Sequence, residues 1–156
     1  MLEEKTQSLR IIPFTELPLG FDLLCDEAAA DGIRFMGRFR TEWENGVNRF
    51  DAAGEMVIGA FIGRELAAVG GLNIDHYMND PHIGRLRHLY VRRSDRRNGL
   101  ATEVVRALVK GGRGHFHTIR LLTDTDTGCA FYDKIGFTRS DSSTATHKLA
   151  LIIGRT

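Results

Sequence analysis

The sequence predicts a mixed α/β fold in which helices flank a mixed sheet. Three observations support this prediction. The apolar residues change from a helical spacing to a strand-like alternation near residue 56, and the helical spacing returns near residue 99. Turns that contain glycine separate these stretches. The predicted order is β-α-α-β-β-β-α-β-α-β-β, and such a mixture implies a mixed sheet covered by helices.

The first half of the chain supplies one strand, two helices and a hairpin. Pro18 and Gly20 leave the start of the first helix open, and Asn45-Gly46 ends the second one. The pair Gly63-Arg64 forms the tight turn of the hairpin. In order, the predicted elements are a strand at 9–14, helices at 17–30 and 33–44, and strands at 56–62 and 66–72.

The second half alternates strands and helices after a polar loop at 75–81. The glycine-rich stretch 111–114 is expected to close a helix, and Gly136 is expected to stop the last one. In order, the predicted elements are a strand at 85–91, a helix at 99–110, a strand at 118–123, a helix at 128–134, and strands at 137–139 and 146–153.

Composition narrows the function classes. The 156 residues are 42% hydrophobic and 26% charged, which fits one soluble domain spanning residues 1–156. A net charge of +1 argues against nucleic acid as a partner. The chain has two cysteines, no zinc-like spacing and no apolar run of about 20 residues. We therefore expect a cytoplasmic protein with no metal and no membrane partner, since residues 1–5 also lack a signal peptide's apolar run.

The most informative segment is a basic strand that leads into a glycine turn. Residues 85–97 contain six arginines, and the turn at 96–101 follows before an apolar helix. A helix start offers free backbone N–H groups and a positive dipole end, so it suits a phosphate. Gly99 has no Cβ and lets the backbone approach closely. Arg97 and Asn98 are expected to act through their backbone N–H groups.

Two motifs in this order resemble the GNAT (GCN5-related N-acetyltransferase) superfamily over nearly the whole chain. Arg96-x-x-Gly99-x-Ala101 matches the acetyl-CoA signature Arg/Gln-x-x-Gly-x-Gly/Ala, and it lies between the fourth strand and the third helix. Phe131-Tyr132, followed by Gly136-Phe137, matches a second motif. The resemblance implies a mostly antiparallel central sheet with a V-shaped opening between the fourth and fifth strands.

The resemblance implies an acetyl-CoA-dependent N-acetyltransferase that transfers the acetyl group directly to a primary amine. Acetyl-CoA is then the co-substrate, and no metal is needed. A backbone N–H at a bulge near Tyr90 or Val91 would polarise the thioester carbonyl. The main chain of Leu89, Val91 and Arg93 would pair with the pantetheine arm. The full set of expected cofactor-binding residues is Leu89, Tyr90, Val91, Arg93, Arg96, Arg97, Asn98, Gly99, Leu100, Ala101 and Thr125.

By the same resemblance, Tyr132 is the acid that protonates the leaving thiolate. Where relatives often carry Asn and Ala before that tyrosine, this chain has Thr125 and Gly128. The general base stays open. Many relatives place a Glu on the fourth strand, which here offers Arg85, Arg87 and His88. The other candidates are Glu42, Glu44, Asp75, His76 and a water molecule.

The acceptor also stays open. Phe35, Phe39 and Trp43 with Glu42 or Glu44 could hold a cationic amine, or the aromatic rings could be core residues. The arginines at 34, 38 and 40 argue equally for an acidic acceptor. We expect a small-molecule amine, a peptide N-terminus or a lysine, and the family is compatible with a homodimer. The alternative function is a catalytically weak sensor of CoA or acyl-CoA with the same fold.

Overall fold

The computed structural model describes residues 8–151, and within this range the strands form one seven-stranded sheet in the order β1-β2-β3-β4-β5-β7-β6. Every neighbouring pair is antiparallel except β4 and β5, which are parallel. The mostly antiparallel mixed sheet is thus confirmed. The strands are β1 (Leu9–Pro13), β2 (Met56–Ile62), β3 (Glu65–Ile74), β4 (Ile83–Val91), β5 (Thr118–Leu121), β6 (Thr138–Arg139) and β7 (His147–Ala150).

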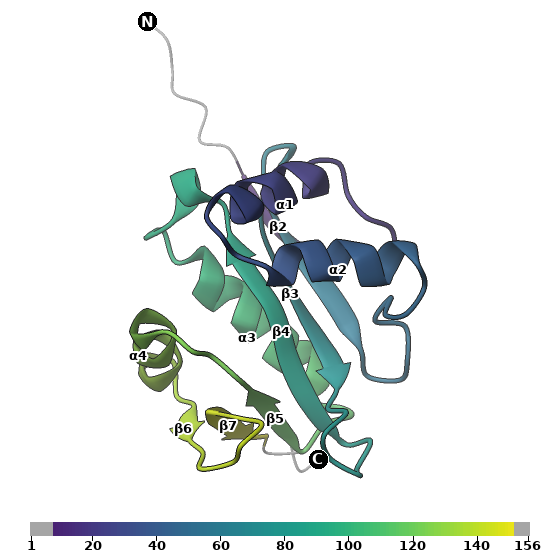
Figure 1. The fold of residues 1–156 in the computed structure, drawn as a ribbon, viewed down its shortest axis with the longest axis vertical. Coiled ribbons are helices and arrows are strands. Elements are labelled where there is room, and N and C mark those ends of the chain that lie inside the picture. Colours follow the sequence, from purple (N-terminus) through teal and green to yellow (C-terminus); the bar gives the residue numbers. More distant parts are fainter. Residues whose placement is uncertain (1–7, 152–156) are drawn as a thin grey trace, which may run out of the picture.

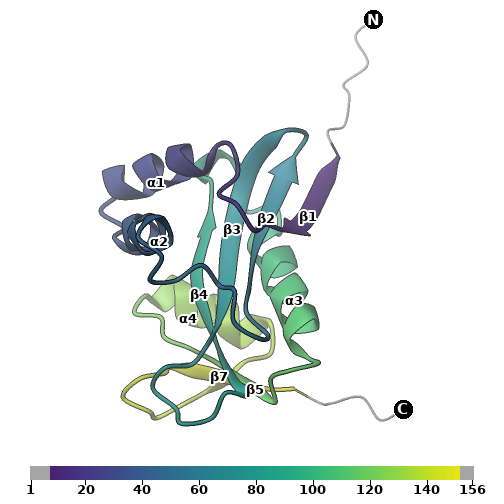
Figure 2. The ribbon, with the colours of Figure 1, turned by 90° about the vertical axis from the view of Figure 1, so that its right-hand side faces the viewer.

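Helices cover both faces of the sheet. The helices are α1 (Phe21–Ala30), α2 (Phe35–Glu44), α3 (Leu100–Gly112) and α4 (Asp126–Lys134), with a short 3-10 turn η1 (Arg93–Asp95) before α3. Figure 2 shows α1 and α2 on one face and α3 on the other. Two hydrophobic cores result, one under α3 that includes residues around α4, and one under α1 and α2. In Figure 1, α4 with β6 and β7 lies beside the β5 end of the sheet.

Several boundaries differ from the predictions for local reasons. α1 begins at Phe21 rather than residue 17, because Gly20 takes a left-handed conformation (φ 93°) and the N–H of Phe21 donates to the Pro18 carbonyl. α2 begins at Phe35 rather than residue 33. β3 and β4 are longer than predicted, ending at Ile74 and beginning at Ile83.

The glycine-rich segment after residue 110 does not end α3 where predicted. Gly111 and Gly112 are still helical because α3 packs closely on the sheet there. A Cβ on Gly111 would lie 2.5 Å from the Met56 sulfur, and one on Gly112 would lie 2.9 Å from Leu72. These glycines therefore serve a close helix–sheet approach.

The parallel pairing of β4 and β5 covers only three residue pairs, which end at Arg85 and Arg120. β5 stops at Leu121 instead of residue 123, and beyond it the N–H of Thr123 donates to the Thr146 side-chain hydroxyl rather than to a backbone carbonyl of the next strand. Among the strands of residues 8–151, β3 alone pairs with β4 beyond Arg85, as far as Val91. The two strands therefore separate, and the predicted V-shaped opening is confirmed.

A bulge interrupts β4 inside this opening. The register with β3 shifts between Val69 and Gly71, so that His88 and Leu89 together oppose Gly70. His88 has φ 60°, which is unusual for a residue with a side chain. The bulge at His88 and Leu89 lies just before Tyr90 and Val91, near which it was expected.

The C-terminal hairpin consists of β6 and β7. α4 begins at Asp126, two residues before the predicted start, since Thr125 caps it. The predicted last strand runs to residue 153, but β7 ends at Ala150 and residues 152–153 lie outside the described range.

Candidate active site

The turn between η1 and α3 presents a row of backbone donors. No acceptor among residues 8–151 takes a hydrogen bond from the N–H groups of residues 97–102. Arg97 and Gly99 both have positive φ, 70° and 79°. A Cβ on Gly99 would meet no atom of residues 8–151 within 4 Å. The N–H groups at the start of α3 are thus available to an anion, and the helix dipole favours one there.

The side chain of Arg96 folds back on β4. Its Nε donates to the Val91 carbonyl at 3.0 Å, and its guanidinium lies over the Tyr90 ring at 5.4 Å. Only its terminal nitrogens therefore stay available for a phosphate. Arg93 is engaged by α1, because its side chain pairs with Asp31 at 2.7 Å and its backbone N–H donates to Glu27. The predicted pairing with the pantetheine arm would require the Arg93 N–H to face an empty strand edge. Instead, this N–H is bonded to Glu27.

The free edge of β4 lies on the side of β5. The N–H of Arg92 donates to the Ala67 carbonyl, and antiparallel alternation then directs the backbone of Tyr90 toward β3. The N–H groups of Leu89 and Val91 consequently point to the opposite edge, where β5 has already diverged. An extended amide-bearing chain could pair with this edge as an added strand.

The β4 face under α1 and α2 carries an unbroken series of polar side chains, and we call it the β4 polar face. Its residues are Arg85, Arg87, His88 and Tyr90. Of these four side chains, His88 is the one whose buried polar atoms lack hydrogen-bond partners in the described chain. Neither ring nitrogen has a partner among the described residues, although the side chain is buried and stacks on Phe39 at 4.7 Å. Burial, with repulsion from Arg87 and Arg38, lowers the pKa of His88 to about 3.

Tyr90 is tied to α1. Its hydroxyl donates to the Glu27 carboxylate, and burial together with this bond raises the pKa of Tyr90 to about 12. The sequence reasoning missed Glu27, since an acidic residue on an amphipathic helix carries no signal for a contact 63 residues away.

Tyr132 lies in the core cluster under α3, packed against Phe131 and Phe137. Its hydroxyl has no hydrogen-bond partner within residues 8–151, yet it is not sealed from solvent. Burial raises the pKa of this phenol, so the side chain keeps its proton at neutral pH. A protonated phenol can donate to a leaving thiolate but cannot act as a base.

Thr125 and Gly128, the two positions at which this chain departs from the residues that relatives often carry, are in contact with each other. The Thr125 hydroxyl accepts the N–H of Gly128 at 3.0 Å and caps α4. A Cβ on Gly128 would lie 2.2 Å from the Thr123 hydroxyl oxygen. An alanine here would require the Thr123 side chain to shift. The hydroxyl of Thr125 can still donate outward.

A cavity of about 770 Å³ lies over the beginning of the β4 polar face. We call it the acceptor cavity. It is bounded by α2, the loop before β2, the ends of β3 and β4 and the residue after β5. Its charged and aromatic lining residues are Arg38, Glu42, Arg49, Asp51, Glu55, His76, Tyr77, Arg85 and Arg87.

The candidate bases differ in their access to this cavity. Asp75 is fully buried, pairs with Arg85 and Arg120, and does not line the cavity. Glu42 lines the cavity 3.8 Å from Arg87, and His76 is exposed at its rim. Glu44 is exposed and does not line the cavity.

The aromatic residues expected near the acceptor belong to the core. Phe39 and Trp43 are 1% and 8% exposed and pack in the cluster under α1 and α2, and Phe35 is half-buried and packs against that cluster. Of the neighbouring arginines, Arg40 pairs with Asp22 at 3.3 Å, and Arg38 lines the acceptor cavity. The open choice between an aromatic cage and core packing is thereby decided for core packing.

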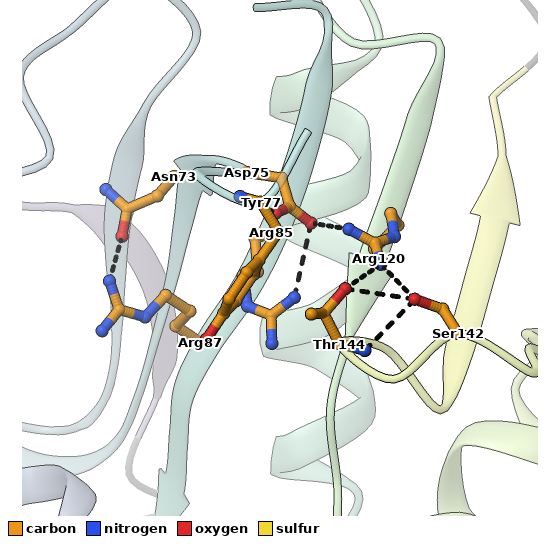
Figure 3. A network of polar contacts seen from close by, with 8 residues as sticks. All are labelled: Asn73, Asp75, Tyr77, Arg85, Arg87, Arg120, Ser142 and Thr144. Carbon is orange, nitrogen blue, oxygen red and sulfur yellow. Dashed lines mark hydrogen bonds and ion pairs between the residues drawn. The ribbon is translucent and has the colours of Figure 1, made fainter. Parts of the chain in front are cut away.

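Figure 3 shows the polar network at the point where β4 and β5 part. The Asp75 carboxylate lies between Arg85 and Arg120, and Arg120 also reaches Ser142 and Thr144 of the β6–β7 hairpin. This network links four segments of the chain. Arg120 was not identified from the sequence, because a charged residue in a short strand resembles a solvent-exposed one.

None of the helices within residues 8–151 has both the length and the apolar character needed to cross a bilayer. In the same range, His, Cys, Asp and Glu side chains form no group of three suited to hold a metal ion.

Comparisons with known proteins agree with this geometry. Among solved structures, a candidate acetyltransferase from Exiguobacterium sp. 255-15 superposes with a TM-score of 0.79 at 20% identity, covering 92% of this chain and 93% of that one. A candidate GNAT-family acetyltransferase from Desulfovibrio desulfuricans gives 0.73 at 13% identity, covering 93% and 100%. The AtaT toxin, whose structure holds the C-terminus of the antitoxin AtaR and acetyl-CoA, gives 0.64 at 11% identity, covering 92% and 93%.

These identities establish the fold alone. No curated protein matches the chain. A family model, however, described as the acetyltransferase (GNAT) family, matches residues 21–137, which is well over half of the sequence. The chain therefore belongs to the acetyltransferase (GNAT) family.

Proposed function

We propose that this chain is an acetyl-CoA-dependent N-acetyltransferase that transfers the acetyl group directly to a primary amine. The observation that carries the proposal is the coincidence of two unpaired backbone surfaces. The N–H groups of residues 97–102 have no acceptor within the described chain, and the edge of β4 beyond Arg85 has no strand partner. The first suits a pyrophosphate and the second suits an amide-bearing arm.

Acetyl-CoA supplies an activated thioester. The residues that would hold it are the turn at 97–101 and the main chain of Leu89 and Val91, with Thr125 on the opposite side of the opening. An N–H at the bulge of β4 would polarise the thioester carbonyl. As the amine nitrogen bonds to the acetyl carbon, the carbon–sulfur bond breaks, and Tyr132 would give its proton to the departing sulfur. The proton that the amine nitrogen loses would pass to a water molecule or to a base at the acceptor cavity, and a proton from solvent would restore the Tyr132 phenol.

The sensor alternative has one observation in its favour. The β4 polar face carries no carboxylate, and the pKa of its histidine is low. A protein that binds CoA without taking the amine's proton would have this arrangement. Turnover separates the two functions, because a sensor binds the cofactor and releases no thiol.

The test is a two-part measurement on the purified chain. Calorimetric titration with CoA measures binding, and detection of free thiol measures transfer from acetyl-CoA to each amine of a broad panel. We expect binding together with amine-dependent thiol release. Tight CoA binding without release on any amine would favour the sensor, and absence of CoA binding would refute both functions.

A further inference from the structure

We propose that the acceptor is an amine that also carries an anionic oxygen group, a carboxylate or a phosphate, and that this group binds Arg85 and Arg87 in the acceptor cavity. The inference rests on the proposed N-acetyl transfer, because it names the kind of amine that the same site takes.

The buried network around Asp75 has more positive than negative charge. Arg85 and Arg120 are 7% and 6% exposed, and both donate to the same carboxylate oxygen of Asp75. One anion therefore serves two buried guanidinium groups, and buried charges are costly unless they are paired. A further anion at this place would balance the surplus.

The Arg85 side chain forms fewer hydrogen bonds than that of Arg120. Its bond to Asp75 is long, 3.4 Å against 2.8 Å for Arg120, whose second terminal nitrogen is bonded to Ser142 and Thr144. Asp75 is the only hydrogen-bond partner of the Arg85 side chain within residues 8–151. The remaining N–H groups of Arg85 are not sealed from solvent, and the residue lines the acceptor cavity.

The Arg85 guanidinium is also held in place. The Tyr77 ring lies 4.8 Å from it, and Figure 3 shows the ring in front of Arg85 with Asp75 above it. A planar guanidinium fixed in this way can offer two parallel N–H groups to one carboxylate or phosphate. Little conformational freedom is left to lose when the anion binds.

Arg87 supplies a second cation on the same face of β4. It donates to the Asn73 side chain at 3.2 Å, but Glu42 lies 3.8 Å away, beyond hydrogen-bond range. Burial lowers the pKa of Arg87, and a bound anion would offset this penalty. Within residues 8–151 the neighbouring Glu55 forms no ion pair with these arginines, and its carboxylate is bonded to three neutral N–H donors instead.

The spacing along β4 suits a small bifunctional amine. Strand residues rise about 3.3 Å each, so Arg87 lies roughly 7 Å before the bulge residue Leu89, and Arg85 lies about 7 Å further. An amine positioned at the bulge could therefore extend its anionic group to these arginines. Asp51 and Glu42 at the cavity wall would repel anions that approach away from the arginines.

The test compares matched pairs of probes that differ only in the anionic group. The pairs are ω-amino acids from β-alanine to 6-aminohexanoate against alkylamines of equal length, and O-phosphoethanolamine against ethanolamine. Binding to the purified chain is measured by calorimetry with and without CoA, and kcat/KM is measured by thiol release. We expect the anionic member of at least one pair to bind roughly 10- to 100-fold tighter, as one charged bidentate contact provides. The pair that discriminates identifies carboxylate or phosphate.

Variants then assign the preference to the arginines. Arg85→Lys and Arg87→Gln should each lower the anionic preference about tenfold. Arg106→Gln is the control, because this arginine is exposed on α3, on the other face of the sheet. Thermal midpoints are recorded for all three variants, and Arg85→Lys keeps the buried charge so that the Asp75 network stays intact.

The inference fails if both members of every pair bind equally, if neither binds, or if the preference survives both arginine substitutions. Its failure differs from failure of the proposed function. Thiol release with uncharged amines and no anionic preference would retain N-acetyl transfer and refute this inference. Selective, arginine-dependent binding without thiol release would support the anion site and refute transfer.

Discussion

The phenol hydroxyl of Tyr90 donates a hydrogen bond to the carboxylate of Glu27, which joins the end of β4 to α1. The same carboxylate accepts the backbone N–H of Arg93 at 3.1 Å. One side chain thus fixes both the last residues of β4 and the first residues of the turn that leads to α3. The Glu27 side chain therefore links helix α1, on the acceptor side, to the turn that holds the predicted phosphate site.

Glu27→Gln should loosen this connection. Both donors bond to the same carboxylate oxygen, so an amide oxygen can accept them but lacks the negative charge that strengthens these bonds. A net loss of about 1–3 kcal/mol in unfolding free energy follows. CoA affinity should fall as well, because the turn at 93–101 is less well ordered. Urea unfolding and calorimetry measure the two effects. Glu44→Gln, at an exposed site on α2, should change stability by less than about 0.5 kcal/mol. Equal stability of both variants would contradict the role of Glu27.

Gly99→Val should weaken CoA binding by roughly 10- to 100-fold, which corresponds to the loss of one or two hydrogen bonds to a charged group. The new side chain would enter the space in front of the free N–H groups, since no atom of the described chain lies within 4 Å of a Cβ there. Gly46→Val provides a control for backbone strain. Gly46 has the same φ of 79° and also has nothing within 4 Å of a Cβ. If both variants bind CoA alike, the pyrophosphate does not bind at Gly99.

Tyr132→Phe should lower the rate of thiol release by about 100-fold, a typical contribution of a general acid. CoA binding and the thermal midpoint should stay nearly unchanged, because the hydroxyl has no partner in the described chain that the substitution would abandon. Burial keeps the pKa of this phenol above its usual value, so the wild-type rate should not fall through loss of this proton below about pH 10. Full activity of the variant would exclude Tyr132 as the acid.

Local patterns predicted the order of elements, because periodicity and turn chemistry determine it. The opening between β4 and β5 was expected from the family resemblance alone. They did not predict features that depend on packing across the sheet. Gly111 and Gly112 read as a loop because glycine is a poor helix former, yet their lack of a Cβ is what lets α3 approach Met56 and Leu72. The Asp75–Arg120 pair joins residues 45 positions apart, and nothing local in either segment indicates its partner.

His88 should give the chain a measurable acid sensitivity. Its pKa is about 3 in the folded protein because burial and the charges of Arg87 and Arg38 oppose protonation, whereas an unfolded histidine titrates near 6.5. Between these values the unfolded chain binds one proton more than the folded chain. Stability therefore falls as the pH decreases from about 6.5 toward 3, by about 1.4 kcal/mol per pH unit from this residue.

His88→Phe removes the titrating group and keeps an aromatic ring against Phe39. Urea unfolding at pH 7, 6, 5 and 4 should show a shallower loss of stability in the variant, with the difference in slope equal to about one proton. His76→Phe, the same exchange at an exposed ring, is the control for the substitution itself. Parallel curves for wild type and His88→Phe would show that the imidazole is not buried in its neutral form. The site would then not contain a buried, neutral His88 imidazole without hydrogen-bond partners at the bulge of β4.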